Sequence, residues 1–301
     1  MIVIFGATGN IGGAAALELR ARGLPVRAVM RDVARAGTLV ATGCEVAMAD
    51  LYDEHAVVDA LRGADAVLVI CPLKPAAEDV EADAGRIIDN LGRAIEAARP
   101  RAVVAISDYG AHRPRGTGIT MIFHRLEQRL AAAPAAMTFL RSAEHMQNWS
   151  RHLRAARQHG VLPSLHHPVS RLFPTVSAPD VGVVAAEILA EPGQHRGGPR
   201  IVHVEGPRRY AASDVAAAVE HLLGLPVEAR ALAREAWLPA LLAGGLGGSY
   251  ARLVTELQDA HNAGGIDVEP GGEVRRGATE LGEALSLARR PVVPMPPPGA
   301  P

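Results

Sequence analysis

A glycine-rich segment near the start of the chain has the residue types and spacing of a phosphate-binding loop. Gly6, Gly9, Gly12 and Gly13 directly follow an apolar run in MIVIFGATGNIGG. Glycines spaced as GxxGxxG permit a tight turn, let the backbone approach a pyrophosphate and let the next helix pack on the strand. The free amides and positive dipole end of that helix attract the anion. The pattern predicts a dinucleotide site, against the alternative of a plain glycine turn.

The residues that follow the next two predicted strands indicate which dinucleotide is bound. Arg31 follows a strand in VRAVMRD, where an arginine suits the 2′-phosphate of NADP and an acid suits the ribose hydroxyl of NAD. We predict NADP, with NADPH preferred over NADH; the alternative is that Arg31 is only solvated and Asp32 binds the ribose. Asp32 could also cap the next helix. Asp50, in AMADLYD, could accept from the adenine amino group or cap a helix.

These residues need a scaffold, and the apolar pattern up to Arg141 supplies one. Strands are expected at 2–5, 26–30, 45–49, 66–70, 102–106 and 137–140, and helices at 11–22, 32–42, 54–62, 80–98 and 119–132. Alternation of this kind is typical of a parallel sheet with right-handed crossovers. The predicted fold class is therefore α/β, a Rossmann-like doubly wound parallel sheet with a smaller C-terminal substrate-side α/β region.

The second half of the chain has a less regular pattern. Residues 1–150 are expected to form the dinucleotide-binding domain and 151–288 the smaller region. We expect a helix at 180–190, a strand at 201–204 and a further helix that Ser213 caps. Glycine pairs interrupt a helical pattern in LLAGGLGGSYARL, and the proline-rich residues 289–301 are expected to be a disordered tail.

Composition restricts the classes of partner. The formal net charge is -1 with both signs spread along the chain, and only 3% of the residues are aromatic, so neither nucleic acid nor a membrane surface is an expected partner. Cys44 and Cys71 do not form a CxxC motif, which argues against a disulfide framework or a zinc site. His166 and His167 are adjacent but have no carboxylate at ligand spacing, so no metal is expected. We expect a cytoplasmic protein with a small-molecule partner.

Several segments together resemble the NmrA-like group of atypical short-chain dehydrogenases/reductases. They are GATGNIG, VMRD, ADLYD, FHRLEQRL, TFLRSAEHMQNW and SAPDVGVVAAEILAEPGQHRGGPRIVHVEGP, and the resemblance spans about residues 1–285. It implies a Rossmann domain to which a strand and a helix return from 173–206. It also implies NADP binding, and the group includes quinone and azo-dye reductases as well as proteins that sense the nicotinamide pool.

The resemblance also implies which residues contact the cofactor and which line the substrate pocket. The predicted cofactor residues are Gly6, Thr8, Gly9, Asn10, Ile11, Gly12, Arg31, Asp50, Leu51, Cys71, Pro72, Ser107 and His124. The residues expected at the substrate pocket are Lys74, close to its mouth, and Met146, Asn148 and Trp149, which would form a mostly apolar wall with a polar handle. Ordinary packing is the alternative for this wall, and an inert buried thiol is the expectation for Cys71.

The catalytic residues are less clearly indicated, because the classical Tyr-Lys pair cannot exist here. Lys74 is the single lysine, and no tyrosine precedes it by four residues. By resemblance, Thr120 and His124 occupy the tyrosine-like and lysine-like positions, and Ser107 occupies the active-site Ser/Thr position. Tyr109, in a loop, could donate to a substrate carbonyl or could simply cover the sheet edge. We name Ser107, Tyr109 and His124 as catalytic candidates; a structural role is the alternative for His124.

Two functions fit these expectations. The first is an NADPH-dependent reductase that passes hydride to a quinone, azo or conjugated carbonyl acceptor, because such acceptors yield a delocalised anion that needs little acid catalysis. The second is a non-catalytic NADP(H)-binding redox sensor, which the absent Tyr-Lys pair favours and which would act through a homodimer or a regulatory protein partner. An epimerase or dehydratase on the same fold is a weaker third alternative.

Overall fold

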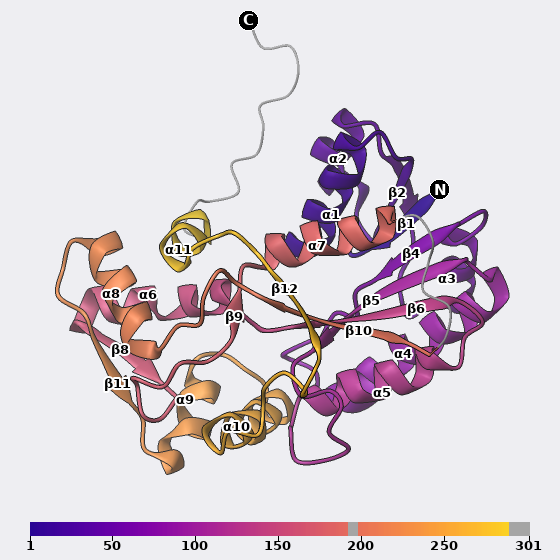
Figure 1. Ribbon diagram of the computed structural model, residues 1–301. Helices are drawn as coiled ribbons and strands as arrows, with labels where there is room; N and C mark the ends of the chain where they lie inside the picture. Colours follow the sequence, from indigo (N-terminus) through magenta and orange to yellow (C-terminus); the bar gives the residue numbers. More distant parts are fainter. Residues whose placement is uncertain (192–197, 289–301) are drawn as a thin grey trace, which may run out of the picture.

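The computed structural model describes residues 1–191 and 198–288 and is built on one large parallel sheet. Its strand order is β12-β10-β6-β5-β4-β1-β2-β3 (Figure 1). The strands are β1 (Ile2–Phe5), β2 (Val26–Met30), β3 (Glu45–Met48), β4 (Ala66–Val69), β5 (Ala102–Asp108), β6 (Ala136–Ser142), β10 (Arg200–Glu205) and β12 (Glu273–Arg276). The chain order reverses between β1 and β4, and ligands of such sheets bind at this switch point, beyond the carboxyl ends of the strands.

Helices cover both faces of the sheet, and each face has its own apolar core. α1 (Asn10–Ala21), α2 (Gly37–Ala41) and α7 (Ala178–Ala190) pack on one face (Figure 1). α3 (Glu54–Ala60), α4 (Val80–Ala98) and α5 (Thr120–Ala131) pack on the other. The central strands β1 and β4 are apolar along their whole length, because helices bury both of their faces.

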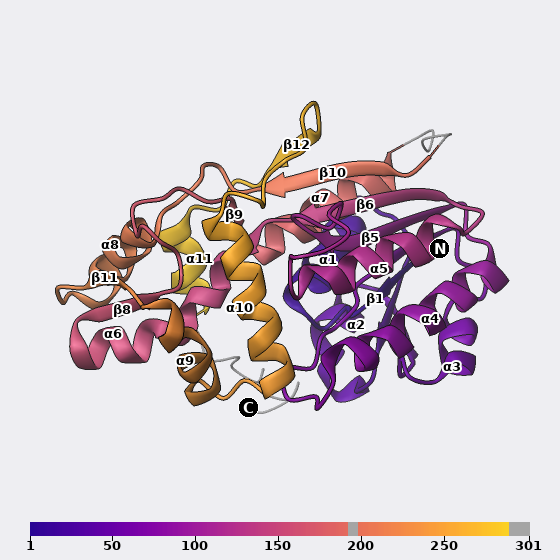
Figure 2. The ribbon, with the colours of Figure 1, turned by 90° about the horizontal axis from the view of Figure 1, so that it is seen from below.

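A smaller region lies beyond the carboxyl edge of the sheet (Figure 2). It contains the parallel pair β8 (Val161–Ser164) and β11 (Glu228–Ala231), with α6 (Leu153–His159), α8 (Ala212–Leu223), α9 (Trp237–Ala243) and α11 (Leu281–Ala288). The two-residue strands β7 (Glu144–His145) and β9 (Thr175–Val176) pair with each other, and the 3-10 turn η2 (Met146–His152) leads into the region. α10 (Gly248–Asn262) lies between this region and α5 (Figure 2).

The predicted fold class is confirmed, and the structure corrects three details. The helix expected at 32–42 is a 3-10 turn η1 (Val33–Arg35) followed by the short α2. Ser213 does not cap its helix; α8 begins earlier, and the Asp214 carboxylate accepts from the Ala211 amide at 2.8 Å. β12 was not expected, because its sequence EVRR lacks an apolar run; it pairs with β10 at the edge of the sheet. The expected tail, 289–301, lies outside the described residues.

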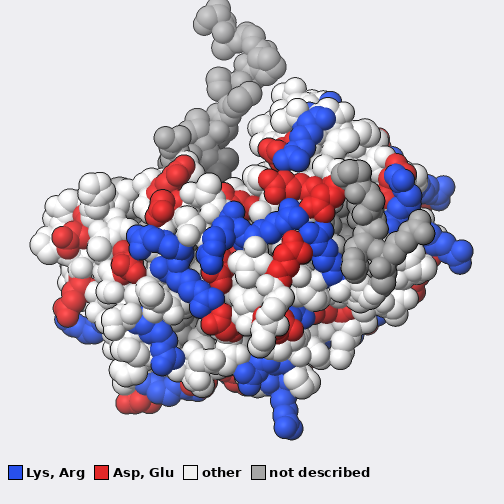
Figure 3. All heavy atoms as spheres, viewed as in Figure 1, with Lys and Arg blue, Asp and Glu red and all other residues white. Residues whose placement is uncertain are grey.

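The surface over β10 and β12 carries both signs of charge (Figure 3). Arg200 binds Glu273 at 2.8 Å, and Arg275 binds Glu191 at 2.6 Å. Because charges of both signs lie side by side, this face presents no large patch of one sign among the described residues. No helix in the described ranges has the length and apolar character needed to cross a membrane.

Candidate active site

The predicted phosphate loop forms a turn between β1 and α1. Gly6 has a positive φ of 70°, and the Gly9 amide donates to the Gly6 carbonyl at 2.9 Å. A Cβ on Gly12 would lie 2.4 Å from the same carbonyl oxygen, so this position requires glycine. Gly9 is the N-cap of α1 and provides no side-chain acceptor. The first amides of α1 therefore lack helical acceptors and can bind an anion.

Arg31 and Asp32 have separate roles at the end of β2. Asp32 accepts from the Ala34 amide at 3.0 Å and caps η1, as the alternative prediction held. Arg31 is exposed and makes no hydrogen bond or ion pair with the described residues, so its guanidinium is free for a phosphate. Arg35, which we did not single out from the sequence, points its Nη2 at the Thr8 carbonyl at 3.5 Å. The sequence feature that could have identified Arg35 is its position four residues after Arg31, close to the same strand end.

The segment after β3 forms a tight turn. Asp50 accepts from the Tyr52 amide at 3.1 Å, whereas Asp53 caps α3 by accepting from the Ala56 amide at 3.2 Å. Asp50 is therefore not the helix cap. The buried Leu51 presents its carbonyl to the Asn90 side chain at 2.9 Å. The turn is thus held by one bond within itself and by one bond from α4.

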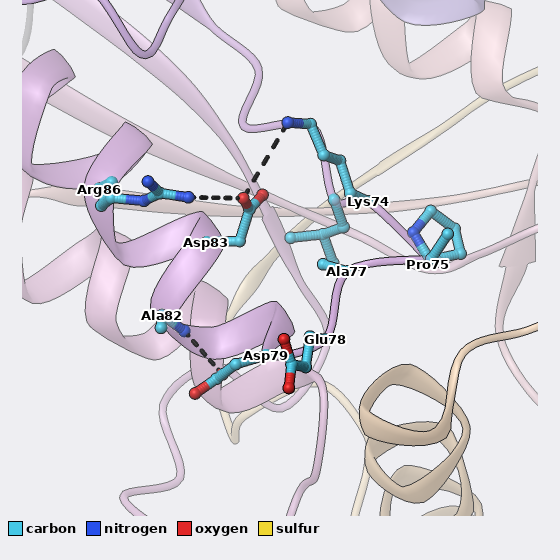
Figure 4. A pocket seen from close by; sticks show the side chains of 10 residues that line it. Lys74, Pro75, Ala77, Glu78, Asp79, Ala82, Asp83 and Arg86 are labelled. Atoms are coloured by element: carbon cyan, nitrogen blue, oxygen red, sulfur yellow. Dashed lines mark hydrogen bonds and ion pairs between the residues drawn. The ribbon is translucent and has the colours of Figure 1, made fainter.

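Lys74 lies in an open cavity of about 890 Å³ at the start of α4 (Figure 4). Its ammonium lies 4.0 Å from Asp83 and 3.9 Å from the centre of the Tyr52 ring, a cation–π contact. The Tyr52 hydroxyl donates to Asp83 at 2.5 Å, and Arg86 binds the same carboxylate at 3.0 Å. Lys74 therefore does not line the central pocket described next, contrary to the sequence prediction.

The central pocket lies at the carboxyl ends of β5 and β6 and has a volume of about 260 Å³. It is closed by α5, η2 and α10. Its polar lining consists of Ser107, Asp108, Tyr109, Ser142, Glu144, His145, Asn148, Arg151, Tyr250, Gln258 and His261. This is the edge at which a doubly wound sheet binds its ligands, so the pocket is the candidate substrate site.

Of the predicted substrate wall, only Asn148 lines this pocket. Met146 is fully buried, and Trp149 is 4% exposed, in the apolar core of the smaller region. The Trp149 ring stacks on Phe173 with 6.2 Å between ring centres. The prediction for Met146 and Trp149 is corrected accordingly: both have the packing role that was the alternative. Both side chains pack in one apolar cluster with Leu281, Ala284 and Leu285 of α11.

The Ser107 hydroxyl is bonded to a buried ion pair. It donates to Glu127 at 2.6 Å, and Glu127 receives two bonds from Arg141, at 2.9 and 2.7 Å. Arg141 also contacts Glu269. The proton of the Ser107 hydroxyl points to Glu127. The hydroxyl oxygen can therefore only accept a hydrogen bond from a ligand.

Tyr109 is buried and its hydroxyl has a partner. The hydroxyl donates to Glu205 at 3.1 Å, and the ring meets His203 edge-on with 5.1 Å between centres. Burial raises the pKa of Tyr109 well above its usual range, and the Glu205 carboxylate raises it further. A role as proton donor would require this bond to break, so the geometry favours a ring that covers the sheet edge.

His124 and Thr120 lie on one face of α5, four residues apart. His124 Nδ1 lies 2.7 Å from the Ala111 carbonyl, so this nitrogen carries the proton and Nε2 is left as an acceptor. The Thr120 hydroxyl donates to Asp108 at 2.5 Å. Burial raises the pKa of Asp108 to about 7, while the Thr120 bond acts in the opposite direction.

The wall opposite β5 holds a chain of polar side chains from distant segments. Glu144 binds His166 Nε2 at 3.1 Å, and Gln258 lies 3.0 Å from His166 Nδ1. Burial acts to raise the pKa of Glu144, but the bond with His166 lowers it, so the pKa lies below its usual value. Burial lowers the pKa of His261 to about 4, so this ring is neutral at physiological pH. His166 thus has a carboxylate partner that its own segment did not reveal, but the described residues contain no cluster suited to a metal ion.

The comparison with known families agrees with the motifs. The model of the NmrA-like family matches residues 1–276. The chain belongs to the NmrA-like family. It is 30% identical over 259 residues to an NAD(P)H azoreductase from Xenophilus azovorans, covering 85% of this chain and 86% of the relative. It is 25% identical over 271 residues to quinone oxidoreductase 2 of Escherichia coli, covering 88% and 90%.

Solved structures share the fold of this NmrA-like protein. The NADPH-dependent quinone oxidoreductase of Escherichia coli in complex with NADPH has a TM-score of 0.78 at 24% identity, covering 95% of this chain and 99% of that one. The Citrobacter triphenylmethane reductase in complex with NADP(H) has a TM-score of 0.76 at 20% identity, covering 95% and 99%. These likenesses establish the shared architecture.

The residues of the NmrA-like protein fit an NADP cofactor. The turn from Gly6 to Gly12 has no room for a Cβ at Gly12. Arg31, at the end of β2, has a guanidinium without a partner among the described residues. Asp32, the acid that NAD would need there, is already used as a cap. Cys71 is buried and burial raises its pKa to about 12, as expected for an inert thiol. Sequence reasoning missed Arg35, Asp108 and Glu144; the acid in AISDYG was the only local signal for Asp108.

Proposed function

We propose that this protein is an NADPH-dependent reductase that acts on quinone or azo acceptors without a Tyr-Lys pair. The observation that carries the proposal is the pocket at the carboxyl ends of β5 and β6, on the same sheet edge as the glycine loop. The names of its relatives, an azoreductase and a quinone oxidoreductase, support the class of acceptor. Conjugated carbonyl compounds belong to the same electronic class.

The residues have distinct roles in this proposal. The first amides of α1, with Thr8, Asn10 and Ile11, hold the pyrophosphate, and Arg31 with Arg35 hold the 2′-phosphate. Asp50 and Leu51 border the adenine. Cys71, Pro72, Ser107 and His124 border the nicotinamide half. When bound, the cofactor supplies the hydride. Tyr109 covers the sheet edge, and the protein places an acceptor ring in the central pocket and excludes water from it.

A redox-sensing protein is the second candidate. It is favoured by the hydroxyls of Ser107 and Tyr109, which are bonded to Glu127 and Glu205 rather than free for a substrate. Such a protein would bind NADP(H) and present a surface to a second copy or to a regulatory partner. We propose a cytoplasmic location for either function, since both use the cellular nicotinamide pool.

One experiment separates these functions. The protein is mixed with NADPH and a panel of quinones and azo dyes, while absorbance at the nicotinamide band is followed and NADP⁺ binding is measured by titration calorimetry. A reductase oxidises NADPH in the presence of at least one acceptor. Tight NADP⁺ binding with no oxidation across the panel would instead support the sensor.

A further inference from the structure

Asp108 is one of the two carboxyl groups that line the central pocket. It is the last residue of β5, directly after Ser107, and it lines the pocket. Its Oδ2 accepts from Thr120 on α5, and no other described side chain bonds to its carboxyl. The carboxyl group therefore lines the pocket with one oxygen bonded to Thr120 and the other without a side-chain partner among the described residues.

The groups that face Asp108 come from four other elements. Glu127 lies on α5, Glu144 and His145 on β7, Arg151 on η2 and Tyr250 on α10. Burial and the two glutamates disfavour the carboxylate, while the hydrogen bonds of Thr120 and the Tyr109 amide favour it. The balance raises the pKa of Asp108 to about 7. Near neutral pH the group can both hold a proton and release it, as a general acid must.

The donors that flank Asp108 on β5 and α5 already have partners. Ser107 donates to Glu127, Tyr109 donates to Glu205, and Thr120 donates to Asp108 itself. His124 directs its Nδ1 at the Ala111 carbonyl. We propose that Asp108 is the general acid that protonates the reduced acceptor, an inference that rests on the proposed reductase function.

The proposed step balances for an azo acceptor. Bound NADPH would supply a hydride, that is two electrons and one hydrogen nucleus, to one nitrogen of the N=N bond and would be left as NADP⁺. The O–H bond of the Asp108 carboxyl breaks, and its proton forms an N–H bond at the other nitrogen, which gives a hydrazine. Asp108 is left as the carboxylate and regains a proton from solvent. A quinone needs this help less, because its reduced anion is delocalised and less basic.

The test compares Asp108→Asn with Thr120→Val. Asparagine keeps the shape and accepts from Thr120 but cannot give up a proton, so we expect the azo-reduction rate to fall about 100-fold or more, with a much smaller loss for a quinone. Wild type should lose azo-reduction rate above about pH 7, and this limb should vanish in Asp108→Asn. Thr120→Val removes a bond that lowers the pKa of Asp108, so the limb should move to higher pH.

A readout independent of turnover completes the test. Infrared difference spectra of the protein without acceptor should show one carboxyl that titrates between about pH 6 and 8 in wild type and not in Asp108→Asn. Asp89→Asn removes an exposed carboxylate of α4 that pairs with Arg125, and it should match wild type in both measurements. NADP⁺ titrations verify that each variant folds and binds the cofactor.

The outcomes are distinct. An unchanged azo rate and pH limb in Asp108→Asn, or no carboxyl titrating in that range in wild type, would overturn the acid role while leaving the reductase function standing. Failure of wild type to oxidise NADPH with any acceptor would overturn the proposed function and the acid role with it. If Asp108→Asn does not fold, the wild-type spectra and the direction of the Thr120→Val shift decide.

Discussion

Arg31 and Asp32 are adjacent in the chain but have different partners. Asp32 is bonded to the Ala34 amide, whereas Arg31 makes no bond with the described residues. A free guanidinium beside the phosphate loop can bind the 2′-phosphate of NADP through paired hydrogen bonds. Preference for NADPH therefore rests on a few side chains.

We predict that Arg31→Glu shifts the cofactor preference toward NADH. A hydrogen bond to a charged group contributes about 1.5–3 kcal/mol, so the ratio of kcat/KM for NADPH to that for NADH should fall at least about tenfold. Steady-state kinetics with both cofactors measure the ratio. Arg157→Glu, an exposed position on α6, is the control and should leave it unchanged. An unchanged ratio in Arg31→Glu would contradict the phosphate assignment.

Asp108 also affects stability. The pH dependence of its contribution to the free energy of unfolding is opposite in sign to that of a carboxylate whose pKa is lowered on folding. Its pKa is raised from about 3.8 to about 7 on folding. The stabilising effect of its neutral form is complete below the unfolded pKa and is lost as pH rises through the folded pKa. Between these values the folded protein binds more protons than the unfolded chain, so wild type becomes less stable as pH increases.

Asp108→Asn should therefore be more stable than wild type at alkaline pH. We expect the difference in free energy of unfolding to be small near pH 4 and to reach a few kcal/mol above pH 7, on the order of the pKa shift. Urea denaturation at both pH values measures it. Asp89→Asn should show no such growth with pH; a constant difference for Asp108→Asn would contradict the pKa assigned to this group.

At the scale of elements, the approach of α7 to α1 depends on one glycine. A Cβ on Gly182 would lie 2.2 Å from the Ile11 carbonyl oxygen, in the first turn of α1. The two helices thus touch backbone to backbone, directly behind the phosphate loop. The returning segment of the chain supports the amides that bind the cofactor.

Gly182→Ala should weaken both folding and cofactor binding. Overpacking of this kind costs about 1–3 kcal/mol, and a displaced α1 moves the amides of Asn10 and Ile11 away from the pyrophosphate. Urea denaturation and NADP⁺ titration calorimetry measure the two effects. Gly282→Ala on α11 meets no atom within 4 Å and should be neutral or slightly stabilising. Equal stability and equal NADP⁺ affinity in the two variants would contradict the role given to the contact between α1 and α7.

At the scale of the whole molecule, the pocket exists because the smaller region closes over the sheet edge. α10 brings His261 into the pocket lining, and burial lowers the pKa of this residue to about 4. Below pH 6.5 the unfolded chain takes up protons that the folded protein does not. The free energy of unfolding then falls as the solution is acidified.

His261→Gln should reduce this acid sensitivity. A shift from 6.5 to about 4 corresponds to at most about 3 kcal/mol lost between those pH values, and the variant should lose correspondingly less. Thermal unfolding at a series of pH values measures the slope. His221→Gln, at an exposed position on α8, should keep the wild-type slope. A wild-type slope in His261→Gln would contradict the burial argument.

The sequence alone determined the features that depend on neighbours along the chain. The glycine loop, Arg31 at a strand end and the strand–helix rhythm are local patterns, so they predicted the fold class, the family and the cofactor. The boundary between the two expected domains is harder to predict from the sequence. The reason is that β10 and β12, which come late in the chain, join the sheet formed by the first half. The irregular pattern after Arg141 held no local mark for β12.

Only the tertiary structure decided what each polar side chain of the pocket contacts. Tyr109 and Glu205 are 96 residues apart, and His166 and Gln258 are 92 apart, yet each pair shares a hydrogen bond. Met146 and Trp149 turned from the pocket into a core for the same reason, since the face a side chain takes in an irregular turn depends on what packs against it. Hydrogen-bond partners and burial set the pKa values, so the protonation state of Asp108 emerges only when β5, α5, β7 and α10 are assembled.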